Sequence, residues 1–249
     1  MTKDILYCGD THLHSAAAYL AGLMTVFDFG FDYVASEQPM ESKLLTVPRK
    51  LFILSDYPAE MFSVELQNQL LEQVEAGAGL LMIGGWESFY GLGGNWNHSP
   101  VANALPVIIS DADDRQNCDQ PVMLQSVEDH EITHQLPWKT NAPLIGGYNR
   151  FVPKPEATVL LNACVHTATC EKELFHFELS HVDPLLVIGS FGKGRTAAFA
   201  TDVAPHWVGP LVDWGDERIR GEAPHAEAIE VGSYYSQFFK QLLTWTGEL

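Results

Sequence analysis

The sequence predicts an α/β protein with a mainly parallel central sheet and helices on both faces. Short apolar runs of strand length alternate with amphipathic stretches of helix length. Strand–helix–strand units of this kind form parallel sheets with right-handed crossovers. The chain of 249 residues is 46% hydrophobic and 18% charged, which is an ordinary globular composition with enough length for a full core.

Each element of the first ninety residues has its own local signal. Ser63 is a good helix N-cap, and leucines recur after it at helical spacing until Gly77 ends the helix. Another helix is expected from about Ser15 to Phe27. Four buried strands are expected, at residues 4–8 (DILYC), 31–35 (FDYVA), 50–54 (KLFIL) and 80–83 (LLMI).

The second part of the chain has more irregular connections. A final helix at about 234–245 should pack back on the sheet. Four further strands are expected, at residues 121–127, 158–161, 185–189 and 195–200. Because there is no internal repeat, low-complexity tract or linker, we expect one domain over residues 1–249, elaborated at about 91–185.

Polar residues follow the predicted parallel strands, where the ligand crevice of such sheets lies. Glu87 is the candidate acid or base of this crevice. The candidate ligand-binding residues are Asp10, Thr11, Ser55, Asp56, Gly85, Trp86 and Ser88.

Three further residues are catalytic candidates. Asp202 and His206 follow a late strand. A buried Asp–His pair can orient a general base, although such a pair can also simply satisfy the hydrogen-bonding groups of a loop. Cys8 ends the first strand and is either a nucleophile near a helix N-terminus or a small buried hydrophobe.

Asp10, His12 and His14 offer an alternative, a metal site, because imidazoles and a carboxylate suit zinc, manganese or iron. The other histidines are scattered without a second His-x-His pair, so hydrogen-bonded or capping histidines are the competing interpretation. We therefore expect no cofactor and keep a divalent metal as the alternative.

Charge excludes two classes of partner. Lys and Arg number 14 against 32 Asp and Glu, a net charge of −18, so no basic stripe is present for nucleic acid and an anionic membrane is repelled. No signal peptide or membrane-spanning segment is expected. Four cysteines without CxxC spacing favour reduced thiols and a cytoplasmic location.

Several segments resemble the glutamine amidotransferase family of the class I amidotransferase-like superfamily. These are FILSD at residues 52–56 and AGAGLLMIGGWESF at 76–89. DHEITHQLP at 129–137 and GKGRTAAF at 192–199 resemble segments of the related trehalose-utilisation (ThuA-like) proteins. The resemblance covers nearly the whole chain and implies a flavodoxin-like three-layer sandwich.

The resemblance does not extend to the chemistry. A class I glutaminase needs a cysteine at the turn after the fourth strand, where this chain has Gly84, Gly85 and Trp86. We therefore expect a protein that does not hydrolyse glutamine and that binds a small metabolite or carbohydrate at the strand ends. The alternatives are a metal-dependent hydrolase using Asp10, His12 and His14, and a non-catalytic homo-oligomeric scaffold built on the aromatic-rich segment from Trp207 onward.

Overall fold

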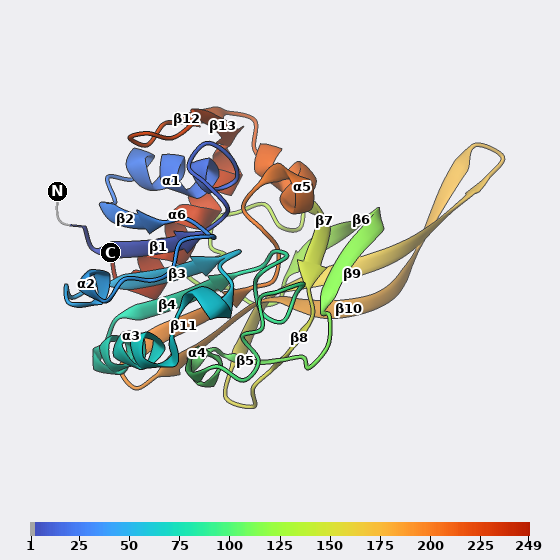
Figure 1. The fold of residues 1–249 in the computed structure, drawn as a ribbon. Coiled ribbons are helices and arrows are strands. Elements are labelled where there is room, and N and C mark those ends of the chain that lie inside the picture. Colours follow the sequence, from blue (N-terminus) through green and yellow to red (C-terminus); the bar gives the residue numbers. More distant parts are fainter. Residues whose placement is uncertain (1–2) are drawn as a thin grey trace.

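A nine-stranded sheet forms the centre of the molecule (Figure 1). The structure is a computed structural model that describes residues 3–249, and the sheet order is β2-β1-β3-β4-β11-β10-β9-β6-β7. The first five of these strands are parallel: β1 (Ile5–Gly9), β2 (Phe31–Val34), β3 (Leu51–Ser55), β4 (Gly79–Ile83) and β11 (Gly194–Phe199). β1, β3 and β4 are buried along their whole length, which explains their continuous apolar sequences.

The other half of the sheet is antiparallel. Its strands are β10 (Leu174–Phe191), β9 (Thr158–Glu171), β6 (Arg115–Ser126) and β7 (Leu144–Asn149). Four strand pairings are parallel and four are antiparallel, so the expectation of a mainly parallel sheet is corrected. One reason is that two-residue connections join β9 to β10 and β10 to β11, and connections this short allow only antiparallel pairing.

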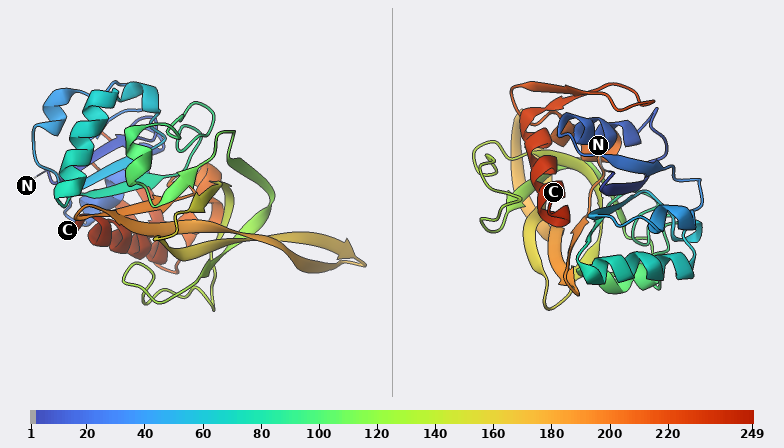
Figure 2. Two further views of the ribbon diagram at one scale, coloured as in Figure 1. Left: turned by 90° about the horizontal axis from the view of Figure 1, so that it is seen from below. Right: turned by 90° about the vertical axis from the view of Figure 1, so that its left-hand side faces the viewer.

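Helices cover both faces of the parallel half, which confirms the three-layer α/β architecture (Figure 2). One layer contains α1 (Ala17–Val26) and α6 (Ser233–Gly247), and the other contains α2 (Ser42–Leu45) and α3 (Val64–Ala76). The predicted cap of α3 is present, since the Ser63 hydroxyl accepts the Leu66 N–H at 3.3 Å. None of the described helices is both long and apolar enough to cross a membrane.

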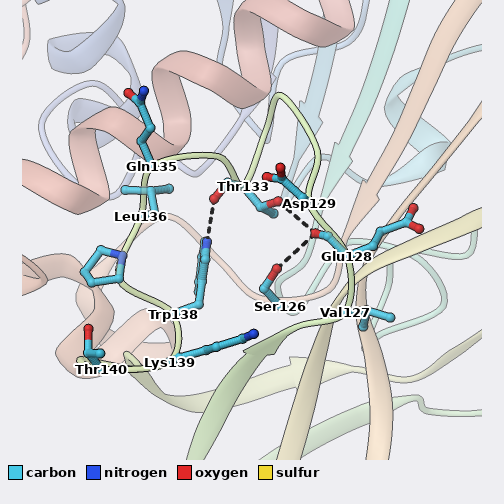
Figure 3. Close-up of a pocket in the computed structure, with 11 residues that line it drawn as sticks. Ser126, Val127, Glu128, Asp129, Thr133, Gln135, Leu136, Trp138, Lys139 and Thr140 are labelled. Atoms are coloured by element: carbon cyan, nitrogen blue, oxygen red, sulfur yellow. Dashed lines mark hydrogen bonds between the residues drawn. The ribbon is translucent and has the colours of Figure 1, made fainter.

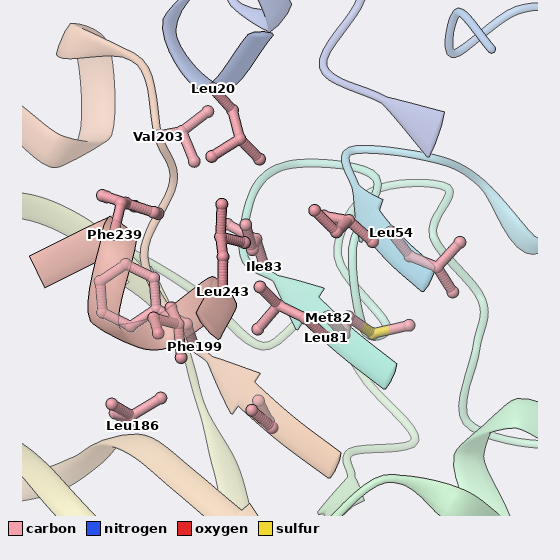
Figure 4. Packing of buried hydrophobic residues seen from close by; sticks show 14 of the residues in the cluster. Leu20, Leu54, Leu81, Met82, Ile83, Leu186, Phe199, Val203, Phe239 and Leu243 are labelled. Carbon is pink, nitrogen blue, oxygen red and sulfur yellow. The ribbon is translucent and has the colours of Figure 1, made fainter. Parts of the chain in front are cut away.

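One layer of the core lies between the sheet and α6. Phe199 on β11 meets Phe239 of α6 edge to face, with ring centroids 5.9 Å apart (Figure 4). Leu81 and Ile83 of β4 and Leu243 of α6 are fully buried in the same layer. Burial of an aliphatic or aromatic side chain of this size stabilises the fold by roughly 1.5–3 kcal/mol. This packing fixes the strands whose ends carry the candidate site.

Short elements complete the chain. The remaining helices are α4 (Pro100–Ala104), α5 (Pro205–Val208) and the 3-10 helices Ala59–Met61 and Gly209–Asp213. Two small antiparallel pairs consist of β5 (Val107–Ile109) with β8 (Phe151–Pro153) and β12 (Arg218–Gly221) with β13 (Ile229–Gly232).

The outer part of the β9–β10 hairpin projects away from the sheet as a long two-stranded ribbon (Figures 1 and 2). We call residues 164–182 the arm. Sequence reasoning predicted strands only at its base, at residues 158–161 and 185–189. The register continues from Ala163 opposite Asp183 to Glu171 opposite Leu174, with a bulge between Leu179 and His181.

Candidate functional site

Three aspartates converge at the carboxyl ends of the parallel strands. Asp10 follows β1, Asp56 follows β3 and Asp202 follows β11, and these strands with β4 are neighbours in the sheet. One oxygen from each carboxylate lies within 4.8 Å of the others. Asp10 and Asp202 are almost completely buried, whereas Asp56 is partly exposed. The sequence analysis predicted Asp10 and Asp56 from their positions after parallel strands. It predicted Asp202 separately, as the partner of His206.

Unusual backbone conformations turn the chain sharply at these strand ends. Asp10, Thr11 and Asp56 have φ of 53°, 64° and 46°, values that residues with a side chain seldom adopt. Gly85 has φ of 155°, and a Cβ there would lie 2.1 Å from Asp56 Oδ1. Only glycine therefore lets the Asp56 carboxylate lie against this loop. Strained backbone of this kind persists where the surrounding structure holds it, often at functional sites.

Hydrogen bonds fix the Asp10 and Asp56 carboxylates. The Tyr7 hydroxyl donates to Asp10 Oδ2 at 3.0 Å, and the Ser55 hydroxyl donates to the same oxygen. The Glu87 backbone N–H donates to Asp56 Oδ1 at 2.7 Å. Ser55 is thus a positioning residue rather than a surface that a ligand can reach, because its side chain is fully buried.

Asp202 and His206 form a contact at the rim of the site. Backbone N–H groups of Val203 and Ala204 donate to Asp202 Oδ1. His206, in the first turn of α5, places Nε2 3.0 Å from Asp202 Oδ2, and about half of its side chain is exposed. The Asp202 carboxylate raises the pKa of His206 above its ordinary value. The structure therefore brings together the pair that the sequence singled out.

Burial and repulsion by neighbouring carboxylates raise the pKa values of Asp10 and Asp56. Burial, followed by the charges of Asp202 and Asp56, raises the pKa of Asp10. Burial and the charge of Asp202 raise the pKa of Asp56 to about 7. Burial and the charge of Glu60 raise the pKa of Glu87. A site of this kind attracts protons, cations, ammonium groups and hydroxyl donors, and it repels anions.

A buried asparagine holds the loop after β4 in place. Asn149, at the end of β7, accepts the Gly85 N–H at 2.9 Å and donates to the Gly85 carbonyl at 3.1 Å and to Asp114 Oδ1 at 2.8 Å. Asp114 also accepts the N–H groups of Tyr90 and Gly91. Asp114 is 3% exposed, so this network is buried. Sequence reasoning missed Asn149, since β7 was not predicted.

Other predicted site residues have supporting or peripheral places. The Ser88 hydroxyl accepts the Asp56 N–H at 2.9 Å and is buried. Trp86 is 45% exposed, and the Arg115 guanidinium lies over its ring at 4.7 Å from the centroid. The backbone N–H of Thr11, an exposed residue, donates to the Ser36 hydroxyl at 2.8 Å.

Two alternatives lack the geometry they need. Cys8 is 1% exposed, and burial raises the pKa of its thiol well above the usual range, which disfavours the thiolate that acts as a nucleophile. His12 and His14 are exposed, and His12 Nδ1 lies 3.4 Å from Glu37. Among residues 3–249, the group close enough to hold a metal is Asp10, Asp56 and Asp202, without either histidine.

A separate cavity lies in the segment that resembles ThuA-like proteins. It has a volume of about 480 Å³ and is lined by residues between Ser126 and Thr140 (Figure 3). The Trp138 indole N–H donates to the Thr133 carbonyl at 2.9 Å, and the Thr133 hydroxyl donates to the Glu128 carbonyl at 3.2 Å. These bonds fold the segment on itself, and none of the strand-end candidates lines this cavity.

Comparison with solved structures shows that other proteins share this fold. Two cytoplasmic proteins from Salmonella typhimurium align with TM-scores of 0.73 at 22% and 23% identity, covering 98% and 97% of this chain and 98% of each relative. A ThuA-like protein from Parabacteroides merdae aligns with a TM-score of 0.55 at 14% identity, covering 99% of this chain and 90% of that protein. At these identities the likeness concerns the fold.

Sequence comparison gives the family. Residues 40–219 match the family described as "Putative glutamine amidotransferase", and the chain belongs to that family. No curated protein sequence matches the chain. The match includes the strand ends after β3, β4 and β11, although the position expected for the glutaminase cysteine is occupied by Gly84, Gly85 and Trp86.

Replacement of Asn149 by alanine is expected to destabilise the fold by about 2–4 kcal/mol, because the N–H and carbonyl of Gly85 lose their buried partner. Urea denaturation measures this change in the free energy of unfolding. The matched control is Asn141→Ala, because Asn141 is exposed. Equal midpoints for the two variants would show that the loop after β4 does not depend on Asn149.

Proposed function

We propose that this family member binds a carbohydrate at the ends of β1, β3 and β11 and does not hydrolyse glutamine. The observation that carries the proposal is the convergence of Asp10, Asp56 and Asp202 beside a loop without a thiol. The proposal also places the protein in the cytoplasm, in keeping with its four free cysteines.

The proposed absence of glutaminase activity follows from the nucleophile. The buried Cys8 thiol is the strand-end sulfur, and its raised pKa favours the inert protonated form. His206 therefore has an acidic partner in Asp202 but no thiol to activate.

The ligand class follows from the groups that remain accessible. Asp56, Glu87 and His206 are at least partly exposed, and carboxylates accept hydrogen bonds from sugar hydroxyl or ammonium groups. Trp86 adds an aromatic surface at the same loop. Because the accessible groups are polar and Asp10 and Asp202 are buried, we expect a small polar ligand rather than a large apolar one.

Purified protein is expected to release no ammonia from glutamine above the buffer rate, because no activated thiol is present. A coupled ammonia assay measures this, with Cys8→Ser as the comparison variant. Turnover at an enzyme-like rate that disappears in Cys8→Ser would contradict the proposal and would make Cys8 the nucleophile.

Glucosamine is expected to bind at least tenfold more tightly than glucose, and glucuronate is expected not to bind, because the site is rich in carboxylates. Isothermal titration calorimetry with the three sugars measures this order. Asp56→Asn should reduce the preference for glucosamine, whereas Asp111→Asn, at an exposed turn, should leave it unchanged. Absence of heat for all three sugars at millimolar concentration would remove the carbohydrate assignment.

The arm supports a second candidate function, assembly with another copy of this chain. The expectation that aromatic residues from Trp207 onward serve assembly has little support, because Trp207 and Trp214 are 3% and 4% exposed. The arm instead exposes Phe175 by 67% and Phe177 by 68%. A two-stranded ribbon is marginally stable by itself in water, so a partner for this surface is expected.

One face of the arm is mainly apolar. Phe175, Phe177 and Leu179 alternate with His176 and Glu178, so the first three share a face. The bulge after Leu179 shifts the register by one residue, and Val182, opposite Cys164, therefore returns to the apolar face. On β9 the same face carries His166, Ala168 and Cys170. It bears no carboxylate, although the chain has a net charge of −18.

The apolar area of this face and its lack of carboxylates favour a second copy of the chain as the partner. The exposed fractions of the apolar side chains on this face correspond to an accessible surface on the order of 400 Å² per arm. Two arms packed face to face would therefore bury roughly 800 Å², to which the polar edges of the arms would add. Specific interfaces begin near about 1,000 Å². A two-fold axis brings identical faces together, and the uncharged strip lets two acidic molecules approach.

The native protein is expected to be a dimer at micromolar concentration, and Phe177→Glu is expected to be monomeric because the new charge lies in the apolar face. Analytical ultracentrifugation measures both. His176→Glu is the matched control, since it places the same charge on the opposite face and should remain dimeric. A native monomer, or a dimer unaffected by Phe177→Glu, would refute assembly through the arm.

A further inference from the structure

Protein donors reach all three strand-end aspartates, and one buried oxygen, Asp202 Oδ2, is left without a hydrogen bond among the described residues. Among the described residues, donors to Asp10 reach Oδ2 and the donor to Asp56 reaches Oδ1. Backbone donors to Asp202 reach Oδ1. In the cluster that the three residues form, one carboxylate oxygen of each lies within 4.8 Å of the others.

Asp202 Oδ2 is the observation that points to a ligand. Asp202 is 0% exposed, and its Oδ2 accepts no aligned hydrogen bond from residues 3–249. His206 Nε2 lies 3.0 Å away but outside the hydrogen-bonding direction. A buried carboxylate oxygen without a donor is costly, so a group from outside the chain is expected to satisfy it.

We propose that Asp10, Asp56 and Asp202 bind one hard divalent cation, of the Mg²⁺ or Mn²⁺ kind. Oxygen-only ligands from carboxylates suit these ions, and three carboxylate oxygens would leave the remaining positions for water or for ligand hydroxyl groups. The inference rests on the proposed strand-end binding site. It differs from the alternative with His12 and His14, because those side chains are exposed and separate from this cluster.

The cation would also explain how three carboxylates share so small a volume. The charges that act most strongly on Asp10 and Asp56 are those of other carboxylates. A divalent ion between them would replace repulsion by attraction, and it would hold the turns after β1, β3 and β11 together. The protein hydrogen bonds to the outer oxygens would then orient the ligands, as outer partners do in known metal sites.

Mn²⁺ alone is the probe, added to metal-free protein and followed by electron paramagnetic resonance and by thermal melting. We expect one Mn²⁺ per chain, competition by Mg²⁺ and a rise in melting temperature. Asp56→Asn should weaken Mn²⁺ binding at least tenfold, while its metal-free form should melt no lower than the native metal-free form, because repulsion is relieved. Asp111→Asn is the control for a change of net charge and should bind like the native protein.

Native protein without stoichiometric Mn²⁺ binding at millimolar concentration would overturn the proposal, and so would tight binding that survives both Asp56→Asn and Asp202→Asn. The outcome is separable from the carbohydrate proposal. Mn²⁺ binding without sugar binding, with or without Mn²⁺, would keep the cation site and remove the carbohydrate. Sugar binding without Mn²⁺ binding would keep the carbohydrate proposal and remove the cation site.

Discussion

The convergence of four parallel strand ends at one edge of the sheet is the constraint on which the site depends. β1, β3, β4 and β11 are consecutive in the sheet and point the same way, so whatever follows them must share one small volume. In this chain three of those continuations are aspartates. Their repulsion is offset by hydrogen bonds from Tyr7, Ser55 and backbone N–H groups, each of which is held in turn by the buried sheet.

The loop after β4 has a different role from the one that family resemblance suggests. Where a glutaminase thiol is expected, Gly85 leaves room for the Asp56 carboxylate, and the Glu87 N–H donates to it. The backbone that would present a nucleophile instead holds an acid. Asn149 and Asp114, from the elaborated half of the chain, hold the same loop from its other side. The antiparallel extension therefore supports the geometry of the parallel half.

Sequence reasoning predicted the parallel half well because its signals are local. Continuous apolar runs, the Ser63 cap and the strand-end rule need no distant partner, and they placed Asp10, Asp56 and the Asp202–His206 pair. The burial of Asp114 depends on Asn149, which is 35 residues away, and no local pattern reveals such a contact. The arm did have a signal, since FHFEL at residues 175–179 alternates apolar and polar side chains as a half-exposed strand does.

The distribution of positive charge indicates that the strand-end aspartates need a neutralising group from outside the chain. Three arginines already pair with other carboxylates: Arg115 with Asp113, Arg49 with Asp32, and Arg150 with Asp183. His206 contributes a single imidazole, which contacts one oxygen of one aspartate. Because the net charge is −18, acidic side chains outnumber the basic side chains that could neutralise them. Neutralisation of the clustered carboxylates is therefore expected to come from bound protons or from a cationic or hydrogen-donating ligand.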